Sequence, residues 1–188
     1  MYTDDEVVAL PDISPDHPRH NYWNDRKRSA QRLVRYLALK KKAASILEVG
    51  CGNGWLSFHL ATVPGSRVIG IDPDYLALHQ AAGVFLHQPN LKFIYGDFCS
   101  GILQGISFDI IVFAASLHHL PSVPEALDAA LAHLSHTGEI HVLDTPMHYR
   151  QELAGYDYRL RRDPRSLLNR LTGKSKGFPW IVISPKTQ

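Results

Sequence analysis

Five short apolar runs, separated by polar or helical stretches, constrain the fold of this 188-residue chain more than any other feature. They cover residues 45–49, 67–71, 91–95, 108–113 and 139–143. Runs of this length with few polar residues are typical of strands that are buried on both faces. Strands that alternate with helices form parallel sheets, so the pattern predicts a doubly wound α/β fold. We expect a mostly parallel sheet with helices on both faces, in a single domain.

Two stretches have helical periodicity. From residue 21 to residue 42, apolar side chains recur at i, i+3, i+4 and i+7, the spacing of one helix face. A second helix is predicted over residues 122–136, where Ser122 and Glu125 have the spacing of a capping box. The first 20 residues are rich in Pro, Asp and His and are predicted to form an irregular arm.

The length suits one domain with a sizeable core and is short for two. We expect residues 43–188 to form that domain, and residues 1–42 to form an arm and a helix that could cover it as a lid. Beyond the fifth apolar run, residues 149–172 are predicted to be a basic helical segment and residues 180–183 a last strand.

Composition excludes several classes of protein. Hydrophobic residues make up 45% and charged residues 20%, which is typical of a globular protein and not of a disordered or fibrous one. No apolar run approaches the length of about 20 residues that crosses a bilayer. The acidic start of the chain lacks the positive charge of a secretory leader, and two cysteines are too few for a disulfide framework. We therefore expect a cytoplasmic protein with no membrane partner.

Charge is arranged in blocks along the chain. Residues 19–42 carry a net charge of +8 and residues 149–188 carry +6, whereas residues 43–148 carry −7. An acidic centre between basic flanks fits a catalytic core better than a nucleic-acid binder, which would carry positive charge across its main surface. Solvated basic helices beside the core would produce the same pattern. The arrangement disfavours a nucleic-acid partner.

The first apolar run ends in a glycine-rich loop, residues 50–54, with Glu48 just before it. Glycines at alternate positions allow a tight turn and a close approach of the backbone to a ligand. A dinucleotide fingerprint that starts at Gly50 needs a third glycine at position 55, where this chain has Trp55. The loop therefore disfavours a nicotinamide-dependent dehydrogenase, and the acid before it suits a ligand with a positive charge.

An acidic residue lies at the end of each of the first three runs: Glu48, Asp72 and Asp97. In open parallel sheets, ligands bind at the carboxyl ends of the strands, and an acid in the position of Asp72 can accept both hydroxyls of a ribose. Any one of these acids could instead cap the helix that follows its strand. Three of them beside a glycine-rich loop favour a nucleoside-containing ligand.

Four segments then resemble a known family. Residues 46–54 are similar to the signature loop of class I S-adenosylmethionine-dependent methyltransferases, and residues 68–72 and 96–98 resemble the second and third motifs of that family. Residues 108–121 resemble the fourth motif, in the form found in the small-molecule "type 11" group. The resemblance covers about residues 45–145 and implies a Rossmann-like fold, S-adenosylmethionine as cofactor, and methyl transfer to an O, N or C atom of a small molecule.

The resemblance also implies a set of cofactor-binding residues. The methionine part of the cofactor would face Glu48, and Asp72 would hold the ribose. Pro73 would pack on the adenine, which would also meet the Asp97 side chain and the Phe98 N–H. The full set is Glu48, Gly50, Cys51, Gly52, Asn53, Gly54, Asp72, Pro73, Asp97, Phe98, Ala114, Ser116 and Leu117.

Two adjacent histidines after the fourth run, His118 and His119, are the candidates for a general base. Removal of a proton from a hydroxyl or amine acceptor can contribute about 10²–10⁴-fold in rate. Neighbouring side chains diverge, so one ring would point into the cleft; alternatively one caps a helix and the other is solvated. Asp144 and His148 are second candidates, and Asp109 is expected to begin the fourth strand, away from the ligand.

Eleven histidines raise the question of a metal site. However, His118 and His119 are adjacent and not four residues apart, and the chain contains no Cys-x-x-Cys or His-Glu-x-x-His pattern. We expect no bound metal. Cys51 and Cys99 both follow predicted strands and are interpreted as packing thiols and not as a redox pair.

Side chains outside the motifs could enclose or attract an acceptor. Arginines between residues 159 and 165 would suit an anionic acceptor, although a solvated basic helix has the same composition. Aromatic residues could form a lid over an apolar or aromatic acceptor, with ordinary helix packing as the alternative. The aromatic residues concerned are Tyr22, Trp23, Tyr149, Tyr156 and Tyr158.

A methyltransferase of small molecules is the leading hypothesis. The alternative is a non-catalytic, S-adenosylmethionine-binding regulatory subunit, because the cofactor loop is nearly complete whereas the acceptor site is unassigned. The short segment after the fifth run leaves little room for a domain that binds a macromolecule, which favours a small acceptor. The sequence is compatible with a monomer or a homodimer.

Overall fold

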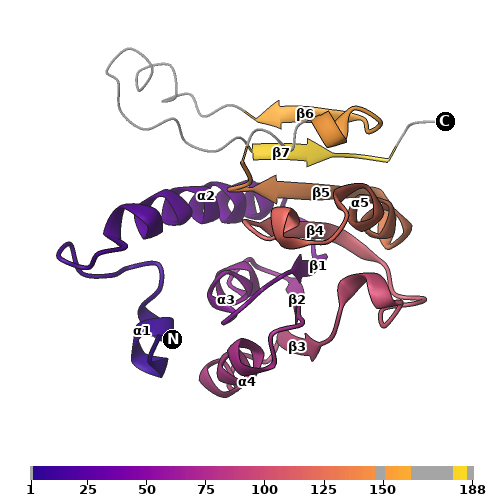
Figure 1. Cartoon of the computed structure of the whole chain (residues 1–188). Coiled ribbons are helices and arrows are strands. Elements are labelled where there is room, and N and C mark those ends of the chain that lie inside the picture. The colour runs from indigo at the N-terminus through magenta and orange to yellow at the C-terminus, as the bar shows by residue number, and fades with distance from the viewer. Residues whose placement is uncertain (1, 147–150, 162–179, 186–188) are drawn as a thin grey trace, which may run out of the picture.

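The computed structural model describes residues 2–146, 151–161 and 180–185 (Figure 1). Seven strands form one sheet in the order β3-β2-β1-β4-β5-β7-β6. The five strands from β3 to β5 are parallel to one another, and β7 pairs antiparallel with both β5 and β6. The strands are β1 (Ala44–Val49), β2 (Ser66–Asp72), β3 (Leu91–Tyr95), β4 (Phe108–Ala114), β5 (Leu134–Leu143), β6 (Tyr158–Arg161) and β7 (Trp180–Ile183).

Helices cover both faces of this sheet (Figure 1). The helices are α1 (Asp4–Ala9), α2 (His20–Leu39), α3 (Trp55–Ala61), α4 (Tyr75–Val84) and α5 (Val123–Ala132), with short 3₁₀ turns η1 (Phe98–Ser100) and η2 (Leu117–His119). One core lies between the sheet and α2 and α3, and a second lies between the sheet and α5. The predicted doubly wound, Rossmann-like fold is therefore confirmed.

The apolar runs form strands because each supplies side chains to both cores. In β1, Ile46 points into the core under α2 and α3, and Leu47 points into the core under α5. In β4, Val112 and Phe113 divide in the same way, and all four side chains are fully buried. Successive residues of a strand face opposite sides of the sheet, so a run without polar residues is stable only when both sides are covered.

The second predicted helix is shorter than expected. It begins at Val123, after Ser122 accepts a hydrogen bond from the Glu125 N–H over 3.3 Å, which is one of the two bonds of a capping box. It ends at Ala132, whereas Leu134, assigned above to the helix, begins β5. The reason is that the Phe108 N–H donates a hydrogen bond to the His133 carbonyl over 2.8 Å. That carbonyl is therefore paired with β4, and the helix does not continue for another turn.

The two ends of the chain also differ from expectation. The arm is not wholly irregular, because Thr3 and Glu6 form a full capping box that starts α1. The segment from 158 to 161, predicted to be helical, is strand β6. Residues 147–150 and 162–179 lie outside the described structure, so the rest of the predicted basic helix is not described. The predicted last strand at residues 180–183 is confirmed as β7.

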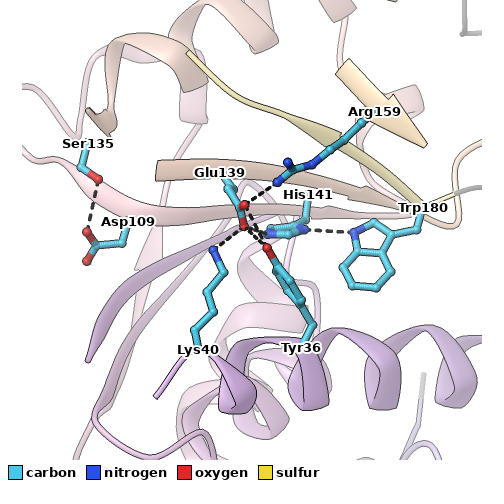
Figure 2. Close-up of polar contacts among 8 residues, drawn as sticks. All are labelled: Tyr36, Lys40, Asp109, Ser135, Glu139, His141, Arg159 and Trp180. Atoms are coloured by element: carbon cyan, nitrogen blue, oxygen red, sulfur yellow. Dashed lines mark hydrogen bonds and ion pairs between the residues drawn. The ribbon is translucent and has the colours of Figure 1, made fainter. Parts of the chain in front are cut away.

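A carboxylate with three hydrogen-bond donors and a close histidine joins α2 to the antiparallel part of the sheet. Figure 2 shows Glu139 of β5 between Tyr36 of α2, Lys40 directly after α2, and Arg159 of β6. Tyr36 Oη donates over 2.8 and 2.9 Å, Lys40 Nζ over 2.6 Å and Arg159 Nη2 over 2.7 Å. Burial acts to raise the pKa of Glu139, but hydrogen bonds from His141, Lys40 and Tyr36 outweigh it and lower that pKa below its usual range.

His141 occupies the centre of this cluster as a neutral ring. Trp180 Nε1–H can only donate, and it donates to His141 Nδ1 over 2.9 Å, so the proton of the imidazole is on Nε2. That nitrogen lies 3.3 Å from a Glu139 oxygen. Burial lowers the pKa of His141, which agrees with the neutral form. The cluster thus holds the C-terminal half of α2 against β5 and β7.

Candidate functional site

The glycine-rich loop follows β1, in the middle of the parallel strands, between the ends of β2 and β4. Gly50, Gly52 and Gly54 all have positive φ, at 73°, 53° and 75°. A Cβ at Gly50 would lie 2.4 Å from the Cβ of Ser116, and one at Gly54 would lie 2.6 Å from the Phe93 ring. Two of these glycines are therefore required by close packing as well as by backbone conformation.

Asp72, at the end of β2, holds this loop in place. Its Oδ2 accepts a hydrogen bond from the Gly52 N–H over 2.7 Å, and its Oδ1 accepts from the Asp74 N–H over 2.8 Å. The residue is only 8% exposed. Each carboxylate oxygen retains a second lone pair, so Asp72 can still accept hydrogen bonds from a ligand.

Glu48 is a buried acid that no cation of the described residues is bonded to. It is 2% exposed, and its Oε2 accepts a hydrogen bond of 2.5 Å from Ser57 Oγ. Burial raises the pKa of Glu48 to about 8, Asp72 adds to the shift, and Arg26 opposes it. At neutral pH this carboxyl is mostly protonated unless a cation comes against it.

The loop after β4 closes the other side of the site. Ser116 Oγ donates to the Val49 carbonyl over 2.5 Å, which ties this loop to the end of β1. Ala115 has a positive φ of 54°, and Leu117 is buried in the core under α5. Of the predicted residues here, Ala114 lines a cavity, whereas Ser116 supports its wall.

A cavity of about 260 Å³ lies in front of the glycine loop. One wall comes from the strand ends and the loops after them. This wall comprises Glu48, Gly50, Cys51, Gly52, Asn53, Trp55, Ala114, Ala115 and His119. The opposite wall comes from the N-terminal arm and the first turns of α2. It comprises Tyr2, Arg19, Tyr22, Trp23 and Arg26.

The two walls meet through aromatic contacts. The rings of Trp23 and Trp55 lie edge to face with centroids 5.3 Å apart, and Trp23 makes a similar contact with Tyr2 at 5.8 Å. Trp23 Nε1 donates to Tyr2 Oη over 2.8 Å. The arm is also tied to α4, because Gln80 Nε2 donates to the Tyr2 carbonyl over 2.8 Å.

Four predicted residues at the ends of β2 and β3 do not line the cavity: Asp72, Pro73, Asp97 and Phe98. Pro73 is exposed, and Asp97 is exposed with its side chain accepting a hydrogen bond from the Cys99 N–H over 2.9 Å. Phe98 is buried, with its ring centroid 6.1 Å from that of Phe113. Asp97 therefore caps η1.

The two candidate histidines differ in position. His119 is exposed and lines the cavity, whereas His118 is half-buried with its ring centroid 4.1 Å from that of His119. Asp144 is buried and directed at α2, where Ser29 Oγ donates to it over 2.7 Å. His148 lies outside the described residues.

Asp109 begins β4, as expected, and accepts hydrogen bonds of 2.9 Å from both the N–H and the Oγ of Ser45. The expectation of two packing thiols is half right, because Cys51 is buried and Cys99 is exposed. Burial raises the pKa of Cys51, so that residue is a neutral thiol in the cavity wall.

Within the described residues, no group of three or more His, Cys, Asp or Glu could hold a metal ion.

The aromatic lid is only partly as predicted. Tyr22 and Trp23 lie in the cavity wall, but Tyr156 Oη donates to Asp128 of α5 over 2.8 Å and Tyr158 packs in the core under α5. Those two tyrosines therefore pack on the face of the sheet opposite α2, away from the cavity, and Tyr149 lies outside the described residues.

The sequence analysis did not predict four residues of the cavity wall: Tyr2, Arg19, Arg26 and Trp55. Trp55 was considered there only as the residue that breaks the dinucleotide fingerprint. A signal for the arginines was present, because positions 19, 23 and 26 continue the helical spacing of the buried residues 30, 33 and 37.

No described helix is both long and apolar enough to span a membrane.

Comparison with known proteins identifies the family. A sequence model described as "Methyltransferase domain" matches residues 22–175. The chain belongs to this methyltransferase family. Its members use S-adenosylmethionine as the methyl donor, and the predicted family and cofactor are thereby confirmed.

Individual relatives of this methyltransferase domain differ in their acceptors. It is 31% identical over 130 residues to a trans-aconitate 2-methyltransferase of Deinococcus radiodurans, covering 69% of this chain and 48% of that protein. It is 35% identical over 112 residues to a tRNA U34 carboxymethyltransferase of Pseudomonas fluorescens, covering 57% of this chain and 34% of that protein. The chain thus spans about half or less of the length of these relatives.

Solved structures support the fold. A magnesium protoporphyrin IX methyltransferase from Synechocystis, solved with bound S-adenosylmethionine, aligns with a TM-score of 0.69. The alignment covers 97% of this chain and 92% of the other, at 15% sequence identity. At that identity, the likeness concerns the arrangement of the sheet and helices alone.

Proposed function

We propose that this methyltransferase domain binds S-adenosylmethionine at the ends of β1, β2 and β4 and transfers its methyl group to a small-molecule acceptor. The observation that carries the proposal is Glu48. It is a buried carboxyl with a raised pKa and no bonded cation in the part of the chain that the structure describes, beside a cavity and a loop of positive-φ glycines. A ligand with an ammonium group would complete it, and the methionine end of S-adenosylmethionine carries one.

The other residues of the site fit the remaining groups of the cofactor. Asp72 has free lone pairs for the ribose hydroxyls, and Arg26 in the cavity wall offers a guanidinium to the methionine carboxylate. Pro73 and the exposed Asp97 at the ends of β2 and β3 would meet the adenine. When bound, the cofactor supplies a methyl group on a sulfonium, which is a good leaving group.

The chain itself would mainly orient and enclose the reactants. Holding two reactants in line can lower a barrier by roughly 7–11 kcal/mol. Trp23 and Trp55 join the two walls by an edge-to-face contact, which limits the access of water to the cavity. His119 lines the cavity and could remove a proton from an acceptor that requires it.

A small acceptor is favoured over a macromolecule because the N-terminal arm covers the cavity. Tyr2 and Trp23 are hydrogen-bonded to each other there, and the arm is held to α4 by Gln80. A base of a folded RNA would have to displace this wall, whereas a metabolite fits beneath it. The matched relatives include both kinds of methyltransferase, one named for trans-aconitate and one for tRNA.

Thermal unfolding with S-adenosylhomocysteine, with NAD as a control, tests the cofactor site. At a ligand concentration of 100 times the dissociation constant we expect a stabilisation of about 2.7 kcal/mol, a rise in Tm of about 5 to 10 °C. NAD should have no effect. If S-adenosylhomocysteine fails to raise the Tm, the site as described is wrong. If it does raise the Tm but no acceptor is ever methylated, the regulatory-subunit alternative gains support.

A further inference from the structure

One face of α2 changes character along its length. Ala30, Leu33 and Leu37 are buried against the sheet, whereas Arg19 and Arg26, on the same face seven residues apart, line the cavity. At a rise of about 1.5 Å per residue, their Cα atoms are about 10 Å apart along the helix. The two guanidinium groups therefore serve different positions of the cavity.

Among the described residues, neither cavity arginine has a carboxylate partner, whereas Lys27 and Arg28 of α2 each form an ion pair. The guanidinium of Arg26 lies over the Tyr22 ring, 4.3 Å from its centroid, which leaves its charge without an anion. The Nε of Arg26 is buried without a hydrogen-bond partner in this part of the chain. Charges that are left unpaired at a cavity are suited to an anionic ligand.

The two arginines lie in different surroundings. The charge of Arg26 acts on both Glu48 and Asp144, so Arg26 belongs to the strand ends and the cofactor side. Arg19 lies two helical turns away, just before the first residue of α2, and lines the cavity together with Tyr2 of the N-terminal arm. Arg19 is therefore the cation on the acceptor side.

Tyr2 adds a neutral donor beside Arg19. Its hydroxyl oxygen already accepts a hydrogen bond from Trp23 Nε1, and its own hydrogen makes no bond to another described residue. Among the described residues, the only acid in the cavity wall is Glu48, and the ammonium group of the bound cofactor would lie against it. This wall presents positive charge and donors, so it would repel the ammonium form of an amine acceptor.

We propose that the acceptor is a small carboxylic acid, that Arg19 and the Tyr2 hydroxyl bind its carboxylate, and that a carboxylate oxygen receives the methyl group. This inference rests on the proposed function. A carboxyl group with an ordinary pKa near 4 is ionised at neutral pH and needs no general base. The reaction therefore does not require His119, which lines the cavity, or Asp144, which is directed at Ser29.

The step balances without a proton acceptor. A C–O bond forms between the carboxylate and the methyl carbon while the methyl–sulfur bond breaks, and the electron pair of that bond goes to sulfur. The products are a methyl ester and S-adenosylhomocysteine. The ester group is neutral and has no charge attraction to Arg19, so the product should dissociate more readily than the acid does.

The test uses the whole chain loaded with S-adenosylhomocysteine and titrated by calorimetry. The probes are benzoate and succinate, their neutral amides benzamide and succinamide, and the cation benzylamine. We expect at least one acid to bind more than tenfold more tightly than its amide, and benzylamine not to bind. Equal binding of acid and amide, or no binding of either acid, would overturn the proposal.

Variants assign the effect to Arg19. Arg19→Gln should weaken binding of the acid by about 10- to 100-fold and leave the stabilisation by S-adenosylhomocysteine unchanged. Arg28→Gln is the matched control, because Arg28 is on the same helix, 67% exposed and paired with Asp25. It should change neither quantity. An Arg19→Gln protein that binds the acid as well as the unmodified chain refutes the role of this residue.

Methyl-labelled S-adenosylmethionine then identifies the product. The proposal requires the transferred label to be released as methanol by alkali, as from a methyl ester. Label that is stable to alkali on an amine or carbon atom contradicts it, although the proposed function would survive. Failure of S-adenosylhomocysteine to bind the unmodified chain would instead refute the proposed function itself, so the two failures are distinguishable.

Discussion

Binding of the cofactor should release a proton from Glu48. In the ligand-free protein, burial raises the pKa of this carboxyl to about 8, so it is mostly neutral at pH 7. The ammonium group of the cofactor would stabilise the charged form and lower that pKa. The carboxyl must therefore ionise as the ligand binds, and affinity must rise with pH.

The size of the effect follows from the pKa of about 8. At pH 7 the free carboxyl is protonated in about nine molecules of ten, so binding should release about 0.9 protons. If the pKa in the complex falls below about 5, the dissociation constant should be about 50-fold larger at pH 6 than at pH 8. Calorimetry with S-adenosylhomocysteine in buffers of different ionisation enthalpy measures the first quantity, and titrations from pH 6 to pH 8 measure the second.

Glu48→Gln is the control, because the amide keeps the shape of the side chain and does not titrate. Its affinity should be weaker than that of the unmodified chain at pH 8 and independent of pH. Without ligand, the stability of the folded chain should change with pH in the opposite direction to the affinity: it should fall as pH rises. The folded-state pKa of Glu48 lies above the unfolded value, so its contribution is lost as pH rises from about 4.5 towards 8, and the variant should be the more stable protein at pH 8. An unmodified chain with equal affinity at pH 6 and pH 8 and no proton release would refute this account.

Three further predictions concern the loop and the sheet. Gly54→Ala should lower the free energy of unfolding in urea by about 2–4 kcal/mol, because its Cβ would overlap Phe93, whereas Gly52→Ala, which has open space, should lower it by about 1 kcal/mol. Asp72→Asn should abolish the thermal shift with S-adenosylhomocysteine, because an amide oxygen can replace only one of the two acceptors of the carboxylate. Glu139→Gln should lower the free energy of unfolding by about 3 kcal/mol at pH 7. The pKa of Glu139 is lowered, so its contribution to the free energy of unfolding should be lost as pH falls below about 4.5. Urea denaturation at pH 7 and at pH 4 measures this loss, and the free energy of unfolding should change less between the two pH values in the variant than in the unmodified chain.

The parallel part of the fold was predictable because its information is local. Each of the first five strands is an apolar run that fills both cores, and that pattern is visible in a few consecutive residues. The boundary between α5 and β5 was not predictable. The helix ends where the His133 carbonyl accepts a hydrogen bond from the Phe108 N–H, and these two residues are far apart in the sequence. The strand at residues 158–161 was missed for the same reason, since its partner is β7 and not a neighbour in sequence.

The candidate site divides in the same way. Glu48 and Asp72 could be singled out because each lies at the end of an apolar run. The outer wall could not, because Tyr2 and Arg19 come to the cavity through contacts such as that between Trp23 and Trp55. Sequence spacing indicated which residues share a face of α2, but only the fold specifies what that face covers.

The two halves of α2 have separate roles. The C-terminal half is fixed by Tyr36 and Lys40 to the buried Glu139, and the middle by Ser29 to Asp144. The N-terminal half carries no such bond to the sheet among the described residues, and it contacts Trp55 of α3 through the Trp23 ring and lines the cavity with Arg26. Tyr36 and Arg19 are 17 residues and so about 25 Å apart along the helix, beyond the about 10 Å within which mutational effects couple directly. One helix can therefore carry both a rigid anchor and an acceptor-binding wall, because substitutions that tune the wall leave the buried charges of the anchor untouched.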